Sequence, residues 1–597
     1  MKKRVADILV ETLVELGIKD CFCVVGGGAM HINNAMHTNH SINVTYSHHE
    51  QACSFAAEGY AKYNGKIAVV SVTSGPGAVN CLNGVYSAYV DNTPMIVIAG
   101  HPRYDTTAQA CGLNLRCRGV QEYNIIPTVQ GMTKYAKMIL DPLAIKQEVI
   151  KAYNIAMEGR RGPVWLTLPL DIQSILVDVT DLYEYQESLE SNINADINNI
   201  ENVIELLKKS KKPIILFGSA IRSADARDEF LELIKRIDVP IIGEPVVSDL
   251  LPSGYKNFYG FSGNIGPRAG NYILQESDLL LILGNSMSTR QTGFNLELFA
   301  PNAKMIMVDI DHDELLKPGL NIDFPIQMDI KLFIKTMNNA IDENIVCSES
   351  WKLFCKKVYN RFSEYDFPEI PVDGTIPQKI FWNIFLDKIA DDAIIALGNS
   401  SCVTGVFQLG TRKYNQRVIT NCNAGSMGYD LPEAYGIAKA SGKTVYCVTG
   451  DGSIMMNLQE LQTIKYNDFK IKIVVFSNNG YGAIRQTCKN YFDGVYAGCD
   501  SKSGVDFPSF KDVATTFDFS YMNCDTYSEL DKVLNRFVDY DGRCILEIKE
   551  DINDTVIPKI MSRMREDGTF ESPSFVDLFP FINEDDERLL EKYREEL

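Results

Sequence analysis

The sequence lacks the features that mark membrane-spanning, disulfide-bonded or zinc-binding proteins. No apolar run approaches the ~18 residues that a bilayer crossing needs. The fifteen cysteines form no CxxC pair and no His/Cys cluster at zinc-ligand spacing. Many lie in apolar runs, such as Cys447 in "TVYCVT" (444–449), which is typical of reduced core thiols in a cytoplasmic protein.

Basic residues are also in short supply. The chain has 58 Lys and Arg against 77 Asp and Glu, a net charge of −19, which argues against nucleic acid or an anionic membrane as the main partner. A phosphorylated ligand stays compatible with this charge, because a bound cation or helix N-termini can hold phosphate. Asp7, Glu11 and Glu15 interrupt the apolar N-terminal stretch, so we expect an amphipathic helix there, no signal peptide and a cytoplasmic location.

What the sequence does have is a regular alternation of short apolar runs and helical patterns. The runs are continuous rather than alternating, which predicts parallel sheets covered by helices on both faces. Predicted strands lie at 42–47, 67–75, 94–100, 212–219, 240–246, 278–286, 304–311, 392–401, 417–425, 444–452, 471–479 and 543–550. A polar stretch at 180–199 and a proline-bearing one at 365–377 predict linkers. We therefore predict an α/β protein with three consecutive domains, 1–185, 186–370 and 371–560, and a C-terminal tail, 561–597.

An acidic residue stands between two glycines in "GDGS" (450–453), at the end of one predicted strand. Asn478 ends the next strand along the chain, and such strand ends meet at one edge of a parallel sheet. Asp451, Asn478 and a nearby carbonyl suit Mg²⁺. Gly452 permits close backbone approach, and Ser453 opens a helix whose free N–H groups favour phosphate. The alternative from these residues alone is that Asp451 caps a helix and Asn478 lies in an incidental turn.

The whole stretch "GDGSIMMNLQELQTIKYNDFKIKIVVFSNNGYG" (450–482) resembles the signature of thiamine diphosphate-dependent enzymes, which begins with GDG and ends with NN. The resemblance implies a pyrimidine-binding domain, a central domain and a diphosphate-binding domain in that order. It also implies thiamine diphosphate and Mg²⁺ as cofactors. The implied Mg²⁺ ligands are Asp451, Asn478 and the carbonyl of Gly480.

A second stretch, "SHHEQACSFAAEGYAKYNGKIAVVSVTSGPGAVN" (47–80), resembles the pyrimidine-domain motif of the acetolactate synthase and pyruvate oxidase group. The resemblance makes Glu50 the acid that hydrogen-bonds the cofactor's pyrimidine ring and assists its activation by proton transfer. Pro76 and Asn80 are further cofactor-binding candidates in this stretch. Taken alone, a glutamate at this position would be interpreted as a partner of a helix dipole.

Two shorter stretches complete the implied cofactor site. "NAGSMGYDLPEAYG" (423–436) resembles the family's GTMGxGLPAA motif, which makes Met427 the residue that supports the bent cofactor and the Gly425 carbonyl an acceptor for its amino group. "GNSS" (398–401) places Asn399, Ser400 and Ser401 where they could donate to the diphosphate. The resemblance also implies a homodimer or homotetramer with each active site between the first domain of one subunit and the third of another.

The chain departs from acetolactate synthases around the implied substrate site. Leu170 replaces a lysine, Ser286 replaces the first arginine of the flavin-contacting region, and Thr487 replaces the tryptophan that shapes the acceptor pocket. Arg290, matched to the arginine that holds the acceptor carboxylate, is retained. A wider pocket with a retained arginine favours a larger anionic acceptor, such as a nucleotide-linked keto sugar, used by similar enzymes of surface-polysaccharide pathways.

The predicted activity is a decarboxylation of a 2-oxoacid, with pyruvate as donor, followed by transfer of the two-carbon unit to a carbonyl acceptor. Gln121 and His31 are the candidates for substrate contact and proton transfer. The alternatives are an acetolactate synthase of branched-chain amino-acid biosynthesis, a simple decarboxylase, and an inactive cofactor-binding regulatory subunit. Whether FAD is bound is left open, and we expect no essential role for it because carboligation has no net redox step.

Overall fold

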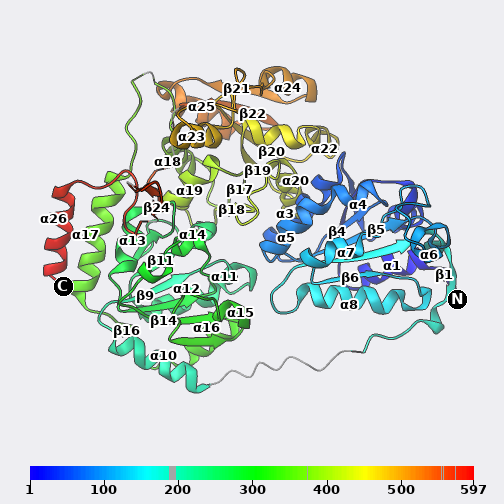
Figure 1. Cartoon of the computed structure of the whole chain (residues 1–597), viewed down its shortest axis with the longest axis horizontal. Helices are drawn as coiled ribbons and strands as arrows, with labels where there is room; N and C mark the ends of the chain where they lie inside the picture. Colours follow the sequence, from blue (N-terminus) through cyan, green and yellow to red (C-terminus); the bar gives the residue numbers. More distant parts are fainter. Residues whose placement is uncertain (187–196, 373, 553, 555–556, 566, 572) are drawn as a thin grey trace.

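A computed structural model describes residues 1–186, 197–372, 374–552, 554, 557–565, 567–571 and 573–597. Three six-stranded sheets follow one another along the chain, each with helices packed against it (Figure 1). The predicted α/β class with three consecutive parallel sheets is therefore confirmed. Residues 187–196 of the predicted linker at 180–199 lie outside the described residues, and the domain boundaries at 185, 370 and 560 stay predictions.

The first sheet has the strand order β3-β2-β4-β5-β7-β6, and every neighbouring pair is parallel. Its inner strands are buried, with all seven residues of β5 buried, whereas the edge strands β3 and β6 are partly exposed. The strands are β2 (Asp20–Cys23), β3 (Asn43–Tyr46), β4 (Val69–Val72), β5 (Met95–His101), β6 (Tyr135–Met138) and β7 (Pro163–Pro169). The main helices are α1 (Val5–Glu15), α2 (Met30–Thr38), α3 (Glu50–Asn64), α4 (Pro76–Asn80), α5 (Leu82–Val90) and α8 (Ile145–Met157).

The central sheet has a different order, β12-β11-β9-β13-β14-β15, and is also parallel throughout. Its strands are β9 (Pro213–Phe217), β11 (Ile241–Gly243), β12 (Phe258–Phe261), β13 (Leu279–Leu283), β14 (Lys304–Asp309) and β15 (Phe324–Gln327). The main helices are α10 (Ile197–Lys209), α12 (Arg227–Arg236), α13 (Arg268–Gln275), α16 (Ile330–Ala340) and α17 (Glu349–Tyr365). Counted along the chain, the order is 3-2-1-4-5-6, which is typical of doubly wound α/β domains.

The third sheet has the parallel order β18-β17-β19-β20-β22-β21. Its strands are β17 (Ile394–Leu397), β18 (Arg417–Ile419), β19 (Val445–Gly450), β20 (Ile471–Ser477), β21 (Ser520–Cys524) and β22 (Cys544–Lys549). Its helices are α18 (Gln378–Lys388), α19 (Ser401–Leu409), α20 (Asp430–Ser441), α21 (Asp451–Ile454), α22 (Glu460–Tyr466), α23 (Gly482–Tyr491), α24 (Phe510–Phe517) and α25 (Tyr527–Asp539). The tail ends in the charged helix α26 (Glu584–Glu595), as predicted, and Asp586 in its first turn pairs with Arg361 of α17.

The first and third domains meet through α3 and α20, which lie against each other in Figure 1. A Cβ atom on Gly436 would lie 2.0 Å from the carbonyl oxygen of Ala56, and one on Gly59 would lie 2.7 Å from that of Glu433. Glycine is therefore needed at both positions because the two backbones touch. Within this chain the complementary faces of the two helices bury each other. The prediction that each active site lies between the first domain of one subunit and the third of another stays a prediction.

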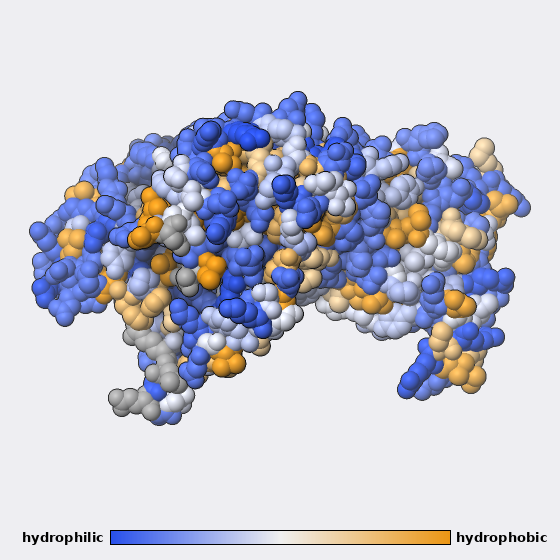
Figure 2. Space-filling view, turned by 90° about the horizontal axis from the view of Figure 1, so that it is seen from above, coloured by the Kyte–Doolittle hydropathy of each residue, from blue (hydrophilic) through white to orange (hydrophobic). Residues whose placement is uncertain are grey.

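The surface and the helices give no sign of a membrane segment. On the face shown in Figure 2, hydrophilic residues predominate and hydrophobic ones are scattered in small groups. Among the described residues, no helix combines the length and the apolar character that a bilayer crossing needs.

Candidate active site

Asp451 lies where β19 ends and α21 begins, and its side chain is almost fully buried. Its Oδ2 accepts hydrogen bonds from the backbone N–H groups of Asn478 (3.0 Å) and Gly480 (3.2 Å). Burial raises the pKa of Asp451 to about 6, against the opposing effect of these N–H donors. Within the described residues, this carboxylate has backbone partners and no ion pair with a basic side chain, so a cation can compensate its charge.

The residues after Asp451 pack closely against neighbouring loops. A Cβ on Gly452 would collide with the ring of Tyr481 at 2.3 Å and would lie 3.6 Å from the terminal methyl of Met427. Ser453 donates from its hydroxyl to Asp430 (2.6 Å) and accepts from the N–H of Gly428 (2.9 Å). The structure thus places Met427 beside the Asp451 turn, and Ser453 secures the Met427 loop through its side chain.

Asn478 follows β20 and is held on three sides. Its backbone N–H bonds Asp451, its Nδ2 donates to Oε2 of Glu550 (2.8 Å), and its Oδ1 accepts from Nη2 of Arg485 (2.6 Å). Burial, together with nearby Asp554, raises the pKa of Glu550 to about 8. Asp451, Asn478 and the backbone of Gly480 therefore form one cluster, as the sequence predicted.

The "GNSS" turn lies beside the Met427 loop. Asn399 donates from Nδ2 to the carbonyl oxygen of Gly425 (2.9 Å), which has a second lone pair free to accept another donor. Ser400 has a left-handed backbone with φ +59° and precedes α19, whose first residue is Ser401. Ser401 accepts at its hydroxyl from Nε2 of Gln378 (3.1 Å). Gly425 itself has φ +59°, where a side chain would be strained.

Glu50 is the first residue of α3 and is only 9% exposed. Its Oε2 accepts from Nδ2 of Asn80 (3.0 Å), and a Cβ on Gly77 would lie 3.0 Å from its Oε1. The turn that contains exposed Pro76 therefore lies directly against Glu50. This contact joins the two ends of the stretch 47–80 that the sequence singled out.

Side-chain contacts connect residues near Glu50 to the third domain. Asn457 donates from Nδ2 to Oε1 of Gln51 (3.2 Å) and to the carbonyl oxygen of Gly428 (2.7 Å). Ser426 bonds the side chain of Asn83 on α5 (3.1 Å). The Glu50 region and the Met427 loop are therefore neighbours across the α3–α20 contact.

Of the two candidates for substrate contact in the first domain, Gln121 lies on a loop and His31 on a helix. Gln121 is exposed and has φ +57°, and its carbonyl oxygen would lie 2.5 Å from a Cβ on Gly75. Glu122 holds this loop, because it accepts from the N–H groups of Ala108 (2.5 Å), Arg118 (2.9 Å) and Gly119 (2.5 Å). His31 is partly exposed on α2, one helical residue beyond the glycine loop.

Two residues were predicted to bind the acceptor substrate, and only one of them lies near the cofactor motifs. Arg290 reaches from the central domain to the Sγ of Cys422 (2.8 Å), which precedes the Met427 loop, and it lines a cavity of about 20 Å³. Thr487 is exposed on α23, and its hydroxyl bonds the carbonyl oxygen of Ala483 in its own helix (3.1 Å). The structure therefore brings Arg290 near the cofactor motifs and leaves Thr487 on an open face.

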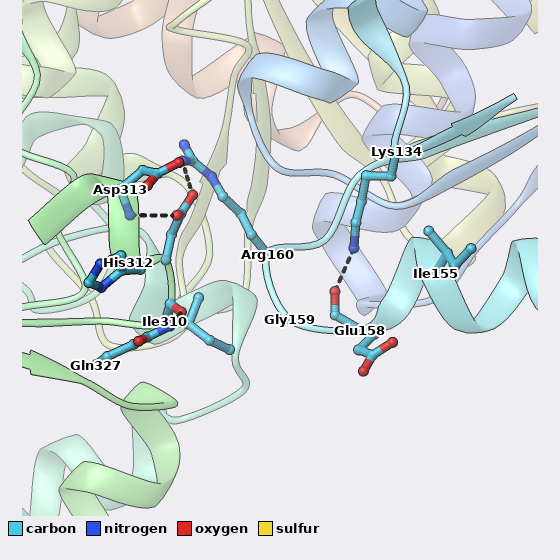
Figure 3. Close-up of a pocket in the computed structure, with 10 residues that line it drawn as sticks. Lys134, Ile155, Glu158, Gly159, Arg160, Ile310, His312, Asp313 and Gln327 are labelled. Carbon is cyan, nitrogen blue, oxygen red and sulfur yellow. Dashed lines mark hydrogen bonds and ion pairs between the residues drawn. The ribbon is translucent and has the colours of Figure 1, made fainter. Parts of the chain in front are cut away.

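A cavity of about 500 Å³ lies elsewhere, between the first and central domains (Figure 3). Arg160 reaches from the loop after α8 to Asp311 (2.9 Å) and Glu314 (2.6 Å) of the central domain. Lys134 bonds the carbonyl oxygen of Glu158 (2.6 Å) on the first-domain side of the cavity. This cavity includes none of the residues predicted from the cofactor motifs.

The residues of the site fit a diphosphate held through a metal ion. The buried Asp451 carboxylate among N–H donors can take a positive partner, and the absence of a side chain at Gly452 makes room for the ring of Tyr481. In the part of the chain that the structure describes, no three His, Cys, Asp or Glu side chains gather into a metal-ligating group. The predicted Mg²⁺ set is of another kind, since it combines one carboxylate with amide and carbonyl oxygens.

Three family models match the chain in the predicted order. They describe the N-terminal TPP binding domain, the central domain and the C-terminal TPP binding domain of thiamine pyrophosphate enzymes, over residues 3–123, 200–337 and 398–548. Thiamine pyrophosphate is another name for thiamine diphosphate. The fold and the site thus define a thiamine diphosphate-dependent enzyme.

Curated relatives match nearly the whole chain. The acetolactate synthase large subunit of Buchnera aphidicola subsp. Schizaphis graminum is 30% identical over 542 residues, which cover 89% of this chain and 91% of the relative. The large subunits of Haemophilus influenzae and Lactococcus lactis subsp. lactis are each 28% identical, covering 93% and 94% of this chain and 95% of each relative. The chain belongs to the thiamine pyrophosphate enzyme family, as an acetolactate synthase-like carboligase.

Three residues around Asn478 were missed by the sequence reasoning: Gln378, Arg485 and Glu550. Glu550 directly follows β22, which neighbours β20 in the sheet. The argument that strand ends gather polar side chains would have found it, since "RCILEIKE" (543–550) ends in this glutamate.

Proposed function

We propose that this carboligase decarboxylates a 2-oxoacid, with pyruvate as donor, and transfers the two-carbon unit to a carbonyl acceptor, with Mg²⁺ as the metal. The observation that carries the proposal is the buried Asp451 among N–H donors, connected across the α3–α20 contact to the region of Glu50. Thiamine diphosphate, when bound, supplies the nucleophilic carbon and the electron sink for decarboxylation.

The chain's own residues divide the work between the two domains. Asp451, Asn478 and the Gly480 carbonyl hold Mg²⁺, while the N–H groups after Ser400 and Asp451 receive the diphosphate. Glu50, oriented by Asn80, holds the proton that the pyrimidine ring exchanges. Met427, Gly425 and Asn399 line the space between these groups.

The acceptor has two candidates. A second 2-oxoacid, giving acetolactate, is supported by the names of relatives that match over nine-tenths of the chain. A nucleotide-linked keto sugar is supported by the open face at Thr487 and by Arg290 near the Met427 loop. In the second case the guanidinium of Arg290 receives the anionic part of the acceptor.

One assay separates these acceptors. Pyruvate consumption and CO₂ release are measured apart from coupled product, with pyruvate alone and with a nucleotide-linked keto sugar added. Efficient formation of acetolactate from pyruvate alone selects the 2-oxoacid acceptor, and CO₂ release that needs the sugar selects the larger one. Uncoupled CO₂ release with an aldehyde product would identify a simple decarboxylase.

Three further properties are part of the proposal. The enzyme works in the cytoplasm as a homodimer or homotetramer, whose size light scattering would measure. Flavin has no essential role, although the 3-2-1-4-5-6 order of the central sheet is compatible with a dinucleotide. A yellow absorbance at stoichiometric amount in the purified protein would contradict the absence of FAD.

A further inference from the structure

A chain of hydrogen bonds runs through the interior of the third domain, from the predicted metal ligand to the predicted diphosphate turn. Asn478 donates from Nδ2 to Oε2 of Glu550 (2.8 Å), and Gln378 donates from Nε2 to Oε1 of the same carboxyl group (2.5 Å). Gln378 also donates to the hydroxyl of Ser401 (3.1 Å). Glu550 and Gln378 are each 4% exposed, so solvent competes little for the Glu550 carboxyl group and the Gln378 amide.

The carboxyl group of Glu550 decides which way the Asn478 amide faces. A carboxyl oxygen accepts a hydrogen bond from the Nδ2 of Asn478, and this leaves Oδ1 turned the other way. Arg485 donates to that Oδ1 at 2.6 Å and to the Asn478 carbonyl at 3.1 Å, so the amide is held from both ends. A reversed amide would place Nδ2 against the guanidinium, donor against donor.

We propose that Glu550, acting with Gln378, is a positioning residue that presents the Oδ1 of Asn478 to the metal and couples this ligand to the Ser401 turn. The inference rests on the proposed function, because it takes Asn478 as a Mg²⁺ ligand. Glu550 does not touch the metal itself. It fixes the orientation of a group that does, and groups in this role typically change metal affinity by 10–100-fold when removed.

These three hydrogen bonds also connect residues that follow three strands of one sheet. Glu550 follows β22, Asn478 follows β20, and Ser401 opens the helix after β17. Gln378 bridges from the first residue of α18. The metal half and the diphosphate half of the site are therefore set by one buried network rather than by two independent loops.

The test is a Mg²⁺ titration of Glu550→Gln by thermal shift, at saturating thiamine diphosphate. The glutamine keeps the shape but turns one acceptor into a donor, so either Asn478 or Gln378 loses its partner. We expect the apparent Mg²⁺ affinity to fall by 10–100-fold, while the melting temperature of the metal-free protein stays close to that of wild type. The matched control is Glu547→Gln on β22, the strand that ends just before Glu550. The Glu547 side chain accepts from the hydroxyl of Tyr521 (2.7 Å), and this variant should titrate as wild type.

A double variant that exchanges the side chains of Gln378 and Glu550, called the swapped pair, distinguishes a positioning role from a purely structural one. Adding Gln378→Glu to Glu550→Gln restores a donor–acceptor match, because the new amide can accept from Asn478 and donate to the new carboxyl group. Mg²⁺ affinity should recover in the double variant. If Glu550→Gln does not fold, Glu550→Asp keeps the acceptor but withdraws it from Asn478, and the same loss of affinity is expected.

The outcomes separate this inference from the proposed function. A wild type whose melting temperature does not respond to Mg²⁺ with cofactor would refute the metal site itself. A normal wild-type response, lost in Asp451→Ala but unchanged in Glu550→Gln, would overturn the positioning role alone. A loss of metal-free stability in Glu550→Gln with no recovery in the swapped pair would also overturn it.

Discussion

The first and third domains share one strand order and carry different side chains at matching places. Counted along the chain, both sheets have the order 2-1-3-4-6-5. After the third strand, the first domain has the neutral turn "TSGPG" (73–77), while the third domain has "GDGS" (450–453) with its buried acid. The acid of the first domain, Glu50, instead begins the helix after the second strand.

The difference shows that the sheet decides where turns face a ligand and the side chains decide what each turn does. The third domain places Asp451, Asn478 and Glu550 after three strands of one sheet, which suits the binding of ions. The first domain places one carboxyl group against its neutral turn, which suits proton transfer. One domain should therefore control cofactor binding and the other the rate.

Removing the acid of the third domain should have the largest effect. In Asp451→Ala, thiamine diphosphate and Mg²⁺ should no longer raise the melting temperature, because stabilisation by a ligand requires binding to the folded state. A thermal-shift titration measures this, with Asp512→Ala on the exposed first turn of α24 as the control. A titration like that of wild type would show that the two turns do not differ in the way we propose.

Replacing the acid of the first domain should affect rate and leave binding intact. Glu50→Gln should still be stabilised by cofactor and Mg²⁺ but should lose on the order of 10²–10⁴ in rate, the usual range for a removed acid–base group. Proton–deuterium exchange at the C2 carbon of the bound cofactor, followed by NMR, measures the step directly. Undiminished exchange would remove Glu50 from proton transfer.

The contact between the two domains should respond to pH. Burial raises the pKa of Glu58, on α3, from its ordinary 4.5 to about 7, although Lys62 lies 2.7 Å from its carboxyl group. Between these pH values the folded protein holds a proton that the unfolded chain releases, so the free energy of unfolding falls as pH rises from about 4.5 to about 7.

Glu58→Gln removes this titration, while neighbouring Glu433, Asp91 and Lys62 stay. The variant should lose less stability than wild type over the same pH range, by up to about 3 kcal/mol. Urea unfolding at pH 5 and pH 8 measures the difference. Equal pH dependence in the two proteins would assign the titration to another group.

The smallest expected effect is that of a single methyl group between the domains. Gly436→Ala places a Cβ 2.0 Å from the Ala56 carbonyl oxygen and should destabilise the paired domains by roughly 1–3 kcal/mol, as overpacking does. Gly131→Ala, where a Cβ meets no atom within 4 Å, is the control and should be near neutral. Equal unfolding curves for both variants would show that the α3–α20 contact is not close in solution.

The sequence predicted the strands that lie inside the sheets better than those at their edges. The runs at 94–100 and 278–286 became β5 and β13, with all strand residues buried. Six strands of the three sheets were missed: the edge strands β6, β12, β15 and β21, and the inner strands β2 and β7, whose residues are all buried. Among the edge strands, β15 buries only one of its four residues. An edge strand needs a less continuous apolar pattern, so its signal is weaker.

The proximity of site residues could be predicted from the sequence where one motif contains them. Asp451 and Asn478 lie together because consecutive strands of a parallel sheet end at one edge. Gln378 and Arg485 could not be found this way, because their partners depend on which strands are neighbours and how a helix begins. The α3–α20 contact likewise joins helices that are far apart in the sequence, so no local pattern predicts it.

The backbone contact between α3 and α20 fixes the distance between these two helices. Where two helices touch through glycine and carbonyl groups, the close backbone approach leaves little room for either helix to shift. The distance between Glu50, at the start of α3, and the Met427 loop, which precedes α20, is therefore set by the packing of the two main chains. Exposed residues outside this contact, such as Thr487 and Gln121, can then change without altering the distance between the two helices.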